Sequence, residues 1–325
     1  LPQSALDGTS VERCQARIAG NNQRKDIHML NGHTVRRSAV IGGALALTVG
    51  LAGCATAETG DAGSDNGDSK GTITLGFIPG WTDGLSTAYL LEDQLEKLGY
   101  TVEMETLTEA APLYIGLAGG DVDIYPSAWS EVTHAAYMEE YGDDIEDLGT
   151  YYAGASLTIA VPTYTEIDSI ADLAGNGDLF DGKITGIEPG AGLTALTQDT
   201  MIPTYGLEGE YELVTSSTAA MLTELGNAID AQEDIVVTLW RPFWANAAFD
   251  IKTLEDPEGA MGGSEGLHFL GTAGFSEEHP EAAELIANIQ LDDAQYGALE
   301  NLVVNEYGEG QYAEAIDAWL EEYPD

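Results

Sequence analysis

The sequence predicts an α/β protein with two lobes and a ligand cleft between them. Short apolar segments alternate with amphipathic segments of helical period along residues 73–239, which is typical of parallel sheets covered by helices on both faces. The alternation falls into two successive sets, and a purely helical pattern follows them. In such folds the ligand lies where strand ends and helix starts converge, so we expect it between the two sets.

The first set is expected to begin with a short strand that leads into an amphipathic helix. Its strands are expected at 73–77, 101–107 and 122–125, and its helices at 86–98, 111–118 and 131–141. This set should form most of one lobe.

The second set has the same alternation and is followed by the helical tail. Its strands are expected at 157–161, 184–188, 212–214 and 235–239, its helices at 193–205 and 219–231, and the tail helices at 276–290, 292–306 and 311–322. We assign residues 72–157 and 268–325 to lobe one and residues 158–267 to lobe two.

The segment before the lobes has the pattern of an export signal. The basic pair Arg36-Arg37 precedes an apolar run that ends in small residues before Cys54, and this run is too short to span a bilayer. Leu51-Ala-Gly-Cys54 resembles the bacterial lipoprotein box. We therefore expect residues 29–53 to be a lipoprotein signal peptide and Cys54 to carry the lipid that anchors the protein to the outer face of the cell membrane.

The residues on either side of this signal have other expected roles. Residues 1–28 look unlike a targeting segment, and Met29 lies where a signal would begin, so residues 1–28 are interpreted as a non-native upstream start. Residues 54–71 are rich in Gly, Ala, Ser, Asp and Thr and are expected to be a flexible tether.

The charge and cysteine content exclude several classes of function. Aspartate and glutamate outnumber lysine and arginine by 56 to 11, for a formal charge of −45. A nucleic-acid partner is therefore not expected, because phosphate backbones bind basic surfaces. With only two cysteines, one of them expected to be lipidated, we expect no disulfide. We also expect no metal and no cofactor, because the usual ligand and catalytic motifs are lacking.

Three tryptophans lie at the carboxyl ends of expected strands or just beyond them. They are Trp81, Trp129 and Trp240. A quaternary ammonium has no N–H to donate, whereas the negative face of an aromatic ring attracts it. Three such rings at strand ends favour an aromatic cage over three unrelated core residues.

A glycine-rich turn joins the expected strand 184–188 to the helix that follows it. Its sequence, Gly190-Ala-Gly192-Leu193-Thr-Ala195, is a partial match to a dinucleotide-binding turn. Free backbone N–H groups at a helix start can equally bind a carboxylate. Both interpretations are open from these residues alone.

Three motifs together resemble the substrate-binding proteins of glycine betaine ABC transporters, over about residues 73–285. The motifs are Trp-Ser-Glu-Val-Thr-His134, Gly186-Ile-Glu-Pro-Gly-Ala-Gly-Leu193 and Val236-Val-Thr-Leu-Trp-Arg-Pro-Phe-Trp-Ala245. The resemblance implies a type II periplasmic-binding-protein-like fold and a monomer that delivers a small zwitterionic quaternary-ammonium ligand to an ABC permease. It implies no enzymatic activity.

The resemblance also implies a role for each matching residue. Trp81, Trp129 and Trp240 would form the cage around the trimethylammonium group, and His134 with the backbone N–H groups of Gly192 and Leu193 would hold the carboxylate. The sequence departs from the family pattern at Arg241 and Phe243, where family members have a small polar residue and a histidine. A charge at Arg241 beside the cage would favour a zwitterion over a plain cation such as choline.

Two kinds of alternative stay open. Within binding proteins, the ligand would be choline, carnitine, proline betaine or a cyclic compatible solute. In another class of protein, the chain would be a dinucleotide-binding enzyme that uses the glycine-rich turn.

Overall fold

The computed structural model describes residues 69–324, which contain nine strands. The expected segments 1–28 and 29–53, Cys54 and most of the tether 54–71 lie outside the described residues. The strands are β1 (Thr72–Phe77), β2 (Thr101–Thr106), β3 (Ile124–Ala128), β4 (Ile145–Pro162), β5 (Lys183–Thr185), β6 (Glu212–Val214), β7 (Val237–Arg241), β8 (Ile251–Thr253) and β9 (Glu265–Thr272). They are connected in the order β2-β1-β3-β9-β4-β7-β5-β6, and β8 pairs with β4.

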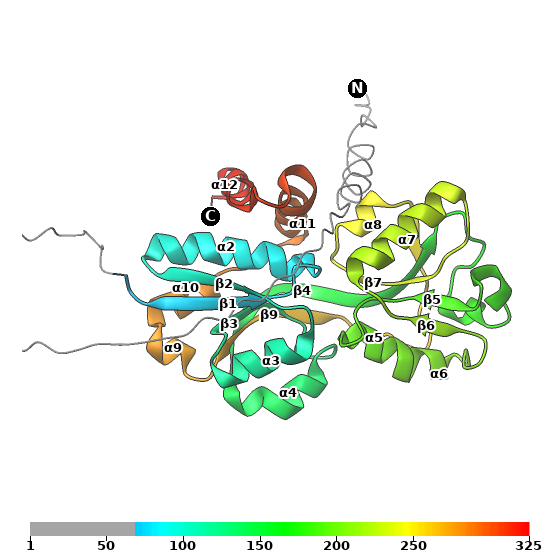
Figure 1. Cartoon of the computed structure of the whole chain (residues 1–325), viewed down its shortest axis with the longest axis horizontal. Helices are drawn as coiled ribbons and strands as arrows, with labels where there is room; N and C mark the ends of the chain where they lie inside the picture. The colour runs from blue at the N-terminus through cyan, green and yellow to red at the C-terminus, as the bar shows by residue number, and fades with distance from the viewer. Residues whose placement is uncertain (1–68, 325) are drawn as a thin grey trace, which may run out of the picture. The chain divides into compact units, whose positions relative to one another are not determined.

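Helices cover both faces of the sheets (Figure 1). The helices are α2 (Thr82–Leu98), α3 (Ala110–Gly119), α4 (Ala135–Tyr141), α5 (Gly192–Leu196), α6 (Ile202–Thr204), α7 (Thr218–Ala231), α8 (Ala245–Ala248), α9 (Phe275–Glu278), α10 (Pro280–Ala287), α11 (Asp293–Asn301) and α12 (Tyr312–Glu322). Three short 3₁₀ segments (Gly142–Asp144, Ile170–Leu173, Gly177–Phe180) and two π segments (Thr197–Met201, Leu302–Tyr307) complete the helical part. Helix α2 lies on one side of β1–β3, with α3 and α4 on the other, and α12 packs on α2.

The long strand β4 belongs to both sheets. Its 18 residues pair antiparallel with β9 over Ile145–Ala155 and then antiparallel with β7 over Ser156–Ala160. We call the part built on β1, β2, β3, β9 and the first part of β4 lobe one, and the part built on β5–β8 and the end of β4 lobe two. The two-lobed α/β fold expected from the sequence is thereby confirmed. The numerical limits given above for each lobe stay a prediction.

The expectation of parallel sheets is wrong for strands β4 and β9. Strand β1 is parallel to β2 and β3, and β5 is parallel to β6 and β7. However, β9 is antiparallel to both β3 and β4, and β4 is also antiparallel to β7 and β8. The sequence analysis missed β9 because Gly266 and Gly271 interrupt it and nearly all its residues are buried, so that no period of two is present.

Several helix boundaries have an identifiable local cause. Helix α2 ends at Gly99, whose φ of 98° is the left-handed conformation that glycine adopts without strain. Asp292 forms a capping box with Gln295 at the start of α11. The Ser217 side chain accepts a hydrogen bond from the Ala220 N–H at the start of α7. Ordinary capping chemistry therefore accounts for these ends.

Candidate ligand-binding site

One pocket contains all six residues that the sequence analysis predicts to contact ligand. Its empty volume is about 350 Å³, part of it open to solvent. The lining residues are Trp81, Asp83, Trp129, Thr133, His134, Leu157, Ile187, Ala191, Gly192, Leu193 and Trp240. The lining residues come from both lobes. That the six residues bind ligand stays a prediction.

The three tryptophans reach the pocket from the carboxyl ends of three strands. Trp81 lies between β1 and α2, Trp129 follows β3 directly, and Trp240 is the penultimate residue of β7. All three side chains are buried, with exposed fractions of 9%, 5% and 4%. Strand-end placement was therefore a sound basis for grouping them.

The pocket contains a buried carboxyl group that the sequence analysis missed. Asp83 lies in the first turn of α2, and its Oδ2 accepts hydrogen bonds from the Ser127 hydroxyl at 2.6 Å and from Trp129 Nε1 at 3.0 Å. Burial raises the pKa of Asp83 above its ordinary value, against the effect of these hydrogen bonds. Asp83 fixes the Trp129 ring and adds an ionisable group to the pocket wall.

A second carboxyl group contacts one of the three tryptophans from the other lobe. Trp81 Nε1 donates to Glu188 Oε2 at 3.2 Å, and Glu188 is in the loop after β5. The Trp240 ring instead stacks on Phe243, with ring centroids 4.0 Å apart and planes at 20°. Each of the three tryptophan rings thus has a different fixed neighbour.

His134 is a buried, neutral side chain. It is 2% exposed, and burial lowers its pKa to about 3. Its Nδ1 lies 3.1 Å from the Tyr114 hydroxyl. When Tyr114 donates this hydrogen bond, the proton of the neutral ring is on Nε2 and can be donated to an anion. The His134 ring also stacks against Trp81, with centroids 5.8 Å apart.

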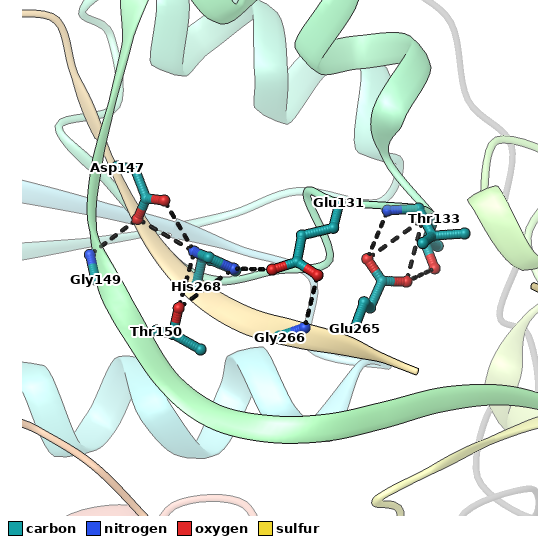
Figure 2. Close-up of polar contacts among 9 residues, drawn as sticks. Glu131, Thr133, Asp147, Gly149, Thr150, Glu265, Gly266 and His268 are labelled. Carbon is teal, nitrogen blue, oxygen red and sulfur yellow. Dashed lines mark hydrogen bonds and ion pairs between the residues drawn. The ribbon is translucent and has the colours of Figure 1, made fainter. Parts of the chain in front are cut away.

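Side chains of strand β9 form hydrogen bonds with the segment between Trp129 and His134 (Figure 2). Glu265 accepts hydrogen bonds from the Val132 N–H at 2.9 Å, the Thr133 N–H at 3.1 Å and the Thr133 hydroxyl.

The second contact between β9 and this segment is made through Glu131. Its carboxylate lies 3.1 Å from His268 Nε2, and His268 Nδ1 lies 3.0 Å from Asp147 on β4. The strand that the sequence analysis missed therefore positions two of the predicted site residues.

The glycine-rich turn of lobe two lies directly against lobe one. A Cβ atom on Gly192 would be 2.1 Å from the Thr133 carbonyl oxygen, and one on Gly190 would be 2.4 Å from Glu109 Oε2. The Gly190 N–H donates to that same Glu109 oxygen at 3.1 Å, and the Tyr137 hydroxyl donates to the Gly190 carbonyl at 3.2 Å. Only glycine permits this approach of the two backbones.

The start of α5 presents free donors to the pocket. The N–H groups of Gly192 and Leu193 precede the first intrahelical hydrogen bond, and they meet no acceptor among residues 69–324. Together with His134 they add hydrogen-bond donors to a pocket that is otherwise lined mostly by aromatic and aliphatic side chains, with Asp83 and Thr133 as further polar residues.

Comparison with known proteins identifies the family. The family described as the substrate binding domain of ABC-type glycine betaine transport systems (OpuAC) matches residues 71–322. The chain belongs to this family.

Individual relatives and solved structures agree with this assignment. The chain is 35% identical over 166 residues to the glycine betaine/carnitine transport binding protein GbuC of Listeria monocytogenes, a match that covers 50% of this chain and 52% of that protein, or about half its length. Two crystal structures are similar at a TM-score of 0.70. One is lactococcal OpuAC in its closed-liganded conformation complexed with glycine betaine (30% identity, 78% of this chain, 96% of that chain). The other is an ABC-transporter choline binding protein in complex with choline (28% identity, 78% and 89%).

The family departures at Arg241 and Phe243 have a structural explanation. The Arg241 side chain is exposed, and its Nη2 donates to the Thr253 hydroxyl at 2.9 Å on β8, so the guanidinium is not among the pocket walls. Arg241 therefore places no charge among the pocket walls that would favour a zwitterion over a plain cation. Phe243 is the ring on which Trp240 stacks.

The turn that partly matches a dinucleotide-binding motif lies against lobe one. Thr133 of lobe one packs on Gly192, at the position that a pyrophosphate would approach in a dinucleotide-binding turn.

Metal sites and membrane-spanning helices can be assessed for the described residues. Among residues 69–324, no group of three or more histidine, cysteine, aspartate or glutamate side chains is arranged to hold a metal ion. Within the same residues, no helix has the length and hydropathy needed to cross a membrane.

Proposed function

We propose that the chain is the extracytoplasmic solute-binding component of an ABC importer and that it binds glycine betaine. The observation that carries the proposal is the convergence of Trp81, Trp129 and Trp240 on one pocket that is also lined by free N–H donors. A zwitterion with a methylated ammonium and a carboxylate matches both kinds of group. Family membership and the betaine-bound lactococcal structure support the same ligand class.

The ammonium end would be recognised without hydrogen bonds. Each cation–π contact contributes roughly 0.5–2 kcal/mol when it is desolvated. The tryptophans are almost fully buried, so most of the solvent would be excluded from these contacts. An ordinary primary ammonium would lose most of its water hydrogen bonds here, because the ring faces accept none and Asp83 is the carboxyl group among the lining residues that could replace one, which would favour methylated ligands.

The carboxylate end would be recognised by neutral donors. The backbone N–H groups of Gly192 and Leu193 carry the positive end of the helix dipole, and His134 would add an N–H from a ring that stays uncharged. Because Gly192 belongs to lobe two and His134 to lobe one, ligand would favour the state in which the lobes meet.

A second candidate ligand is a plain quaternary cation such as choline. Asp83 favours it, because an ionised carboxylate in the pocket wall attracts net positive charge. Carnitine, proline betaine and cyclic compatible solutes fit the same cage in principle and are further members of the test panel.

Family membership also supports a location and a partner for the protein. Two relatives are named as periplasmic binding proteins, which supports an extracytoplasmic location. We further propose lipid anchoring through Cys54, action as a monomer, and an ABC permease as the partner. Metabolic labelling with a palmitate analogue in the wild type and in Cys54→Ala tests the anchor, and loss of label in the variant is the expected result.

Titration calorimetry with a panel of ligands tests the proposed ligand. Glycine betaine, proline betaine, carnitine, choline and NAD would each be titrated into the protein, and glycine betaine is expected to bind most tightly. NAD should not bind. Tighter binding of choline than of betaine would replace the main proposal with the second candidate, and binding of none would contradict both.

A further inference from the structure

Glu188 makes hydrogen bonds to both lobes. Within lobe two its Oε1 accepts from the Thr218 N–H at 2.9 Å and its Oε2 from the Thr218 hydroxyl at 3.0 Å. The same Oε2 accepts from Trp81 Nε1 of lobe one at 3.2 Å. Thr218 begins the 14-residue helix α7, so the positive end of that helix dipole faces the carboxylate.

Glu188 is firmly placed and has no cationic partner within the described residues. Its side chain is 9% exposed, and no ion pair joins it to a lysine, arginine or histidine among residues 69–324. Its backbone carbonyl accepts from the Thr194 hydroxyl at 2.8 Å and from the Ala191 N–H at 3.1 Å. The residue is thus fixed in lobe two by its main chain and side chain, and its contact to Trp81 is the one that crosses between lobes.

The three cage rings differ in where their support comes from. Trp129 is held by Asp83, and Trp240 stacks on Phe243, each within its own lobe. The Trp81 indole N–H, by contrast, has its acceptor in the opposite lobe. This acceptor is lost whenever the lobes separate.

We propose that Glu188 is a positioning residue that completes the cage only when the lobes meet, by fixing the Trp81 ring from lobe two. The inference rests on the proposed function. Glu188 does not need to touch ligand for this role. Glu188 stabilises the closed state through Trp81 and leaves the open state unchanged. Its contact should therefore lower the rate of ligand dissociation, koff.

Hydrogen exchange of the indole N–H groups in the wild type tests this without altering Glu188. In protein labelled with ¹⁵N-tryptophan, the Trp81 resonance is assigned by its absence in Trp81→Phe. Its N–H should exchange readily in free protein and become protected with saturating glycine betaine. The Trp129 N–H bonds Asp83 in the same lobe and should be protected in both states. Equal protection of the Trp81 N–H with and without ligand would overturn the proposal.

Stopped-flow kinetics provide the second test. Glu188→Gln should raise koff for glycine betaine about tenfold, equivalent to ~1.4 kcal/mol, with kon changed less than twofold. In the Trp81→Phe background, which keeps a ring but lacks the N–H, adding Glu188→Gln should have no further effect on koff. Equal effects in the two backgrounds would overturn the proposal.

Glu210→Gln is the matched control. Glu210 is also in lobe two and also accepts hydrogen bonds within that lobe, from the N–H groups of Gly175 and Gly177, but it accepts none from lobe one among residues 69–324. Its substitution removes the same charge and should leave koff unchanged. If the wild type binds none of the ligand panel, the proposed function fails together with this inference. If the wild type binds and Glu188→Gln does not couple to Trp81, only this inference fails.

Discussion

The two lobes contribute to the pocket in different ways. Lobe one supplies two tryptophans and a network of buried titratable side chains, among them Asp83, His134 and Glu300. The buried polar residues of lobe two are mostly threonines, such as Thr158, Thr185 and Thr238, and the lobe faces the pocket with Trp240, aliphatic side chains and backbone N–H groups. Sensitivity to pH and to ligand charge should therefore reside in lobe one, whereas lobe two should act mainly through its position.

Glu300 is the clearest example of this difference. It extends from α11, where it accepts a hydrogen bond from the Thr82 hydroxyl beside Trp81. Burial raises the pKa of its carboxyl to about 8, and the neighbouring Asp83 adds to the rise.

The largest expected effect is on affinity, and it tests whether both lobes contribute rings. Replacing Trp81, Trp129 or Trp240 by alanine should each weaken glycine betaine binding about tenfold or more, because each removes a desolvated cation–π contact. Replacement by phenylalanine should cost less, because a ring face remains. Calorimetry measures both series. Unchanged affinity in any two alanine variants would exclude the cage, and unchanged affinity in Trp240→Ala alone would confine recognition to lobe one.

The next effect is on the pH dependence of stability. Because the folded-state pKa of Glu300 lies above its ordinary value of 4.5, its contribution to stability is fully present below pH 4.5 and is lost as pH rises through about 8. Glu300→Gln resembles the protonated form, so it should flatten this decline and raise the unfolding free energy at pH 8 by roughly 1–3 kcal/mol. Urea denaturation between pH 5 and 8.5 measures it.

Glu210→Gln is the control from lobe two for this stability prediction. Hydrogen bonds from Gly175 and Gly177 lower the pKa of Glu210, so its contribution has the opposite sign, being present above its ordinary pKa and lost as pH falls. The variant should not be stabilised at pH 8. If the unfolding free energy of Glu300→Gln declined with rising pH as much as that of the wild type, this pH dependence could not be assigned to lobe one.

A smaller effect concerns how binding depends on pH. His134, with a pKa of about 3, keeps one protonation state between pH 5 and 8. His134→Gln should therefore lower betaine affinity by a constant factor, with a pH profile parallel to that of the wild type. Any loss of affinity on acidification should come from Asp83, whose pKa is raised, and should vanish in Asp83→Asn. If His134→Gln flattened the pH profile of betaine affinity instead, the titrating group would be His134 and not Asp83.

The smallest expected effect is in lobe two. The hydroxyl of Thr238 on β7 is buried and has no hydrogen-bond partner among residues 69–324. Thr238→Val replaces an unpaired polar group by a methyl of the same shape, so it should be neutral or stabilise by up to about 1 kcal/mol. Ser127→Ala in lobe one should destabilise, because it removes one hydrogen-bond donor from Asp83. Thermal unfolding of both variants compares them. Destabilisation by Thr238→Val would show that lobe two also depends on its buried hydroxyls.

The sequence was sufficient to predict that three tryptophans line one pocket, because strand ends in such folds face one cleft. Trp81, Trp129 and Trp240 each follow an apolar strand, and this position brought them together without knowledge of their contacts. The strand at Glu212–Val214 and the helix ending at Ala231 were predicted for the same local reasons.

The missed features depend on contacts between distant parts of the chain. Glu188 and Trp81 are 107 positions apart, and no periodicity indicates that an indole N–H and a carboxylate will meet. Strand β9 lacked a pattern because both of its faces are buried. Asp83 stood two residues from Trp81 in the sequence, and an acid so close to a predicted cage ring was the signal that could have revealed it.

The position of β9 also determines the order in which the protein can be assembled from its N-terminus. Strand β9 lies between β3 and β4, yet its residues come after every strand of lobe two. All the strands of lobe two have been made by Thr253, whereas lobe one keeps an unpaired gap in its sheet until Thr272 has been added. A chain leaving a ribosome or a translocation channel therefore holds an open sheet edge while the inserted lobe is completed, the stage at which pairing with other chains is most favourable. Because β9 also carries Glu265, the Trp129 segment gains its support only at that last step.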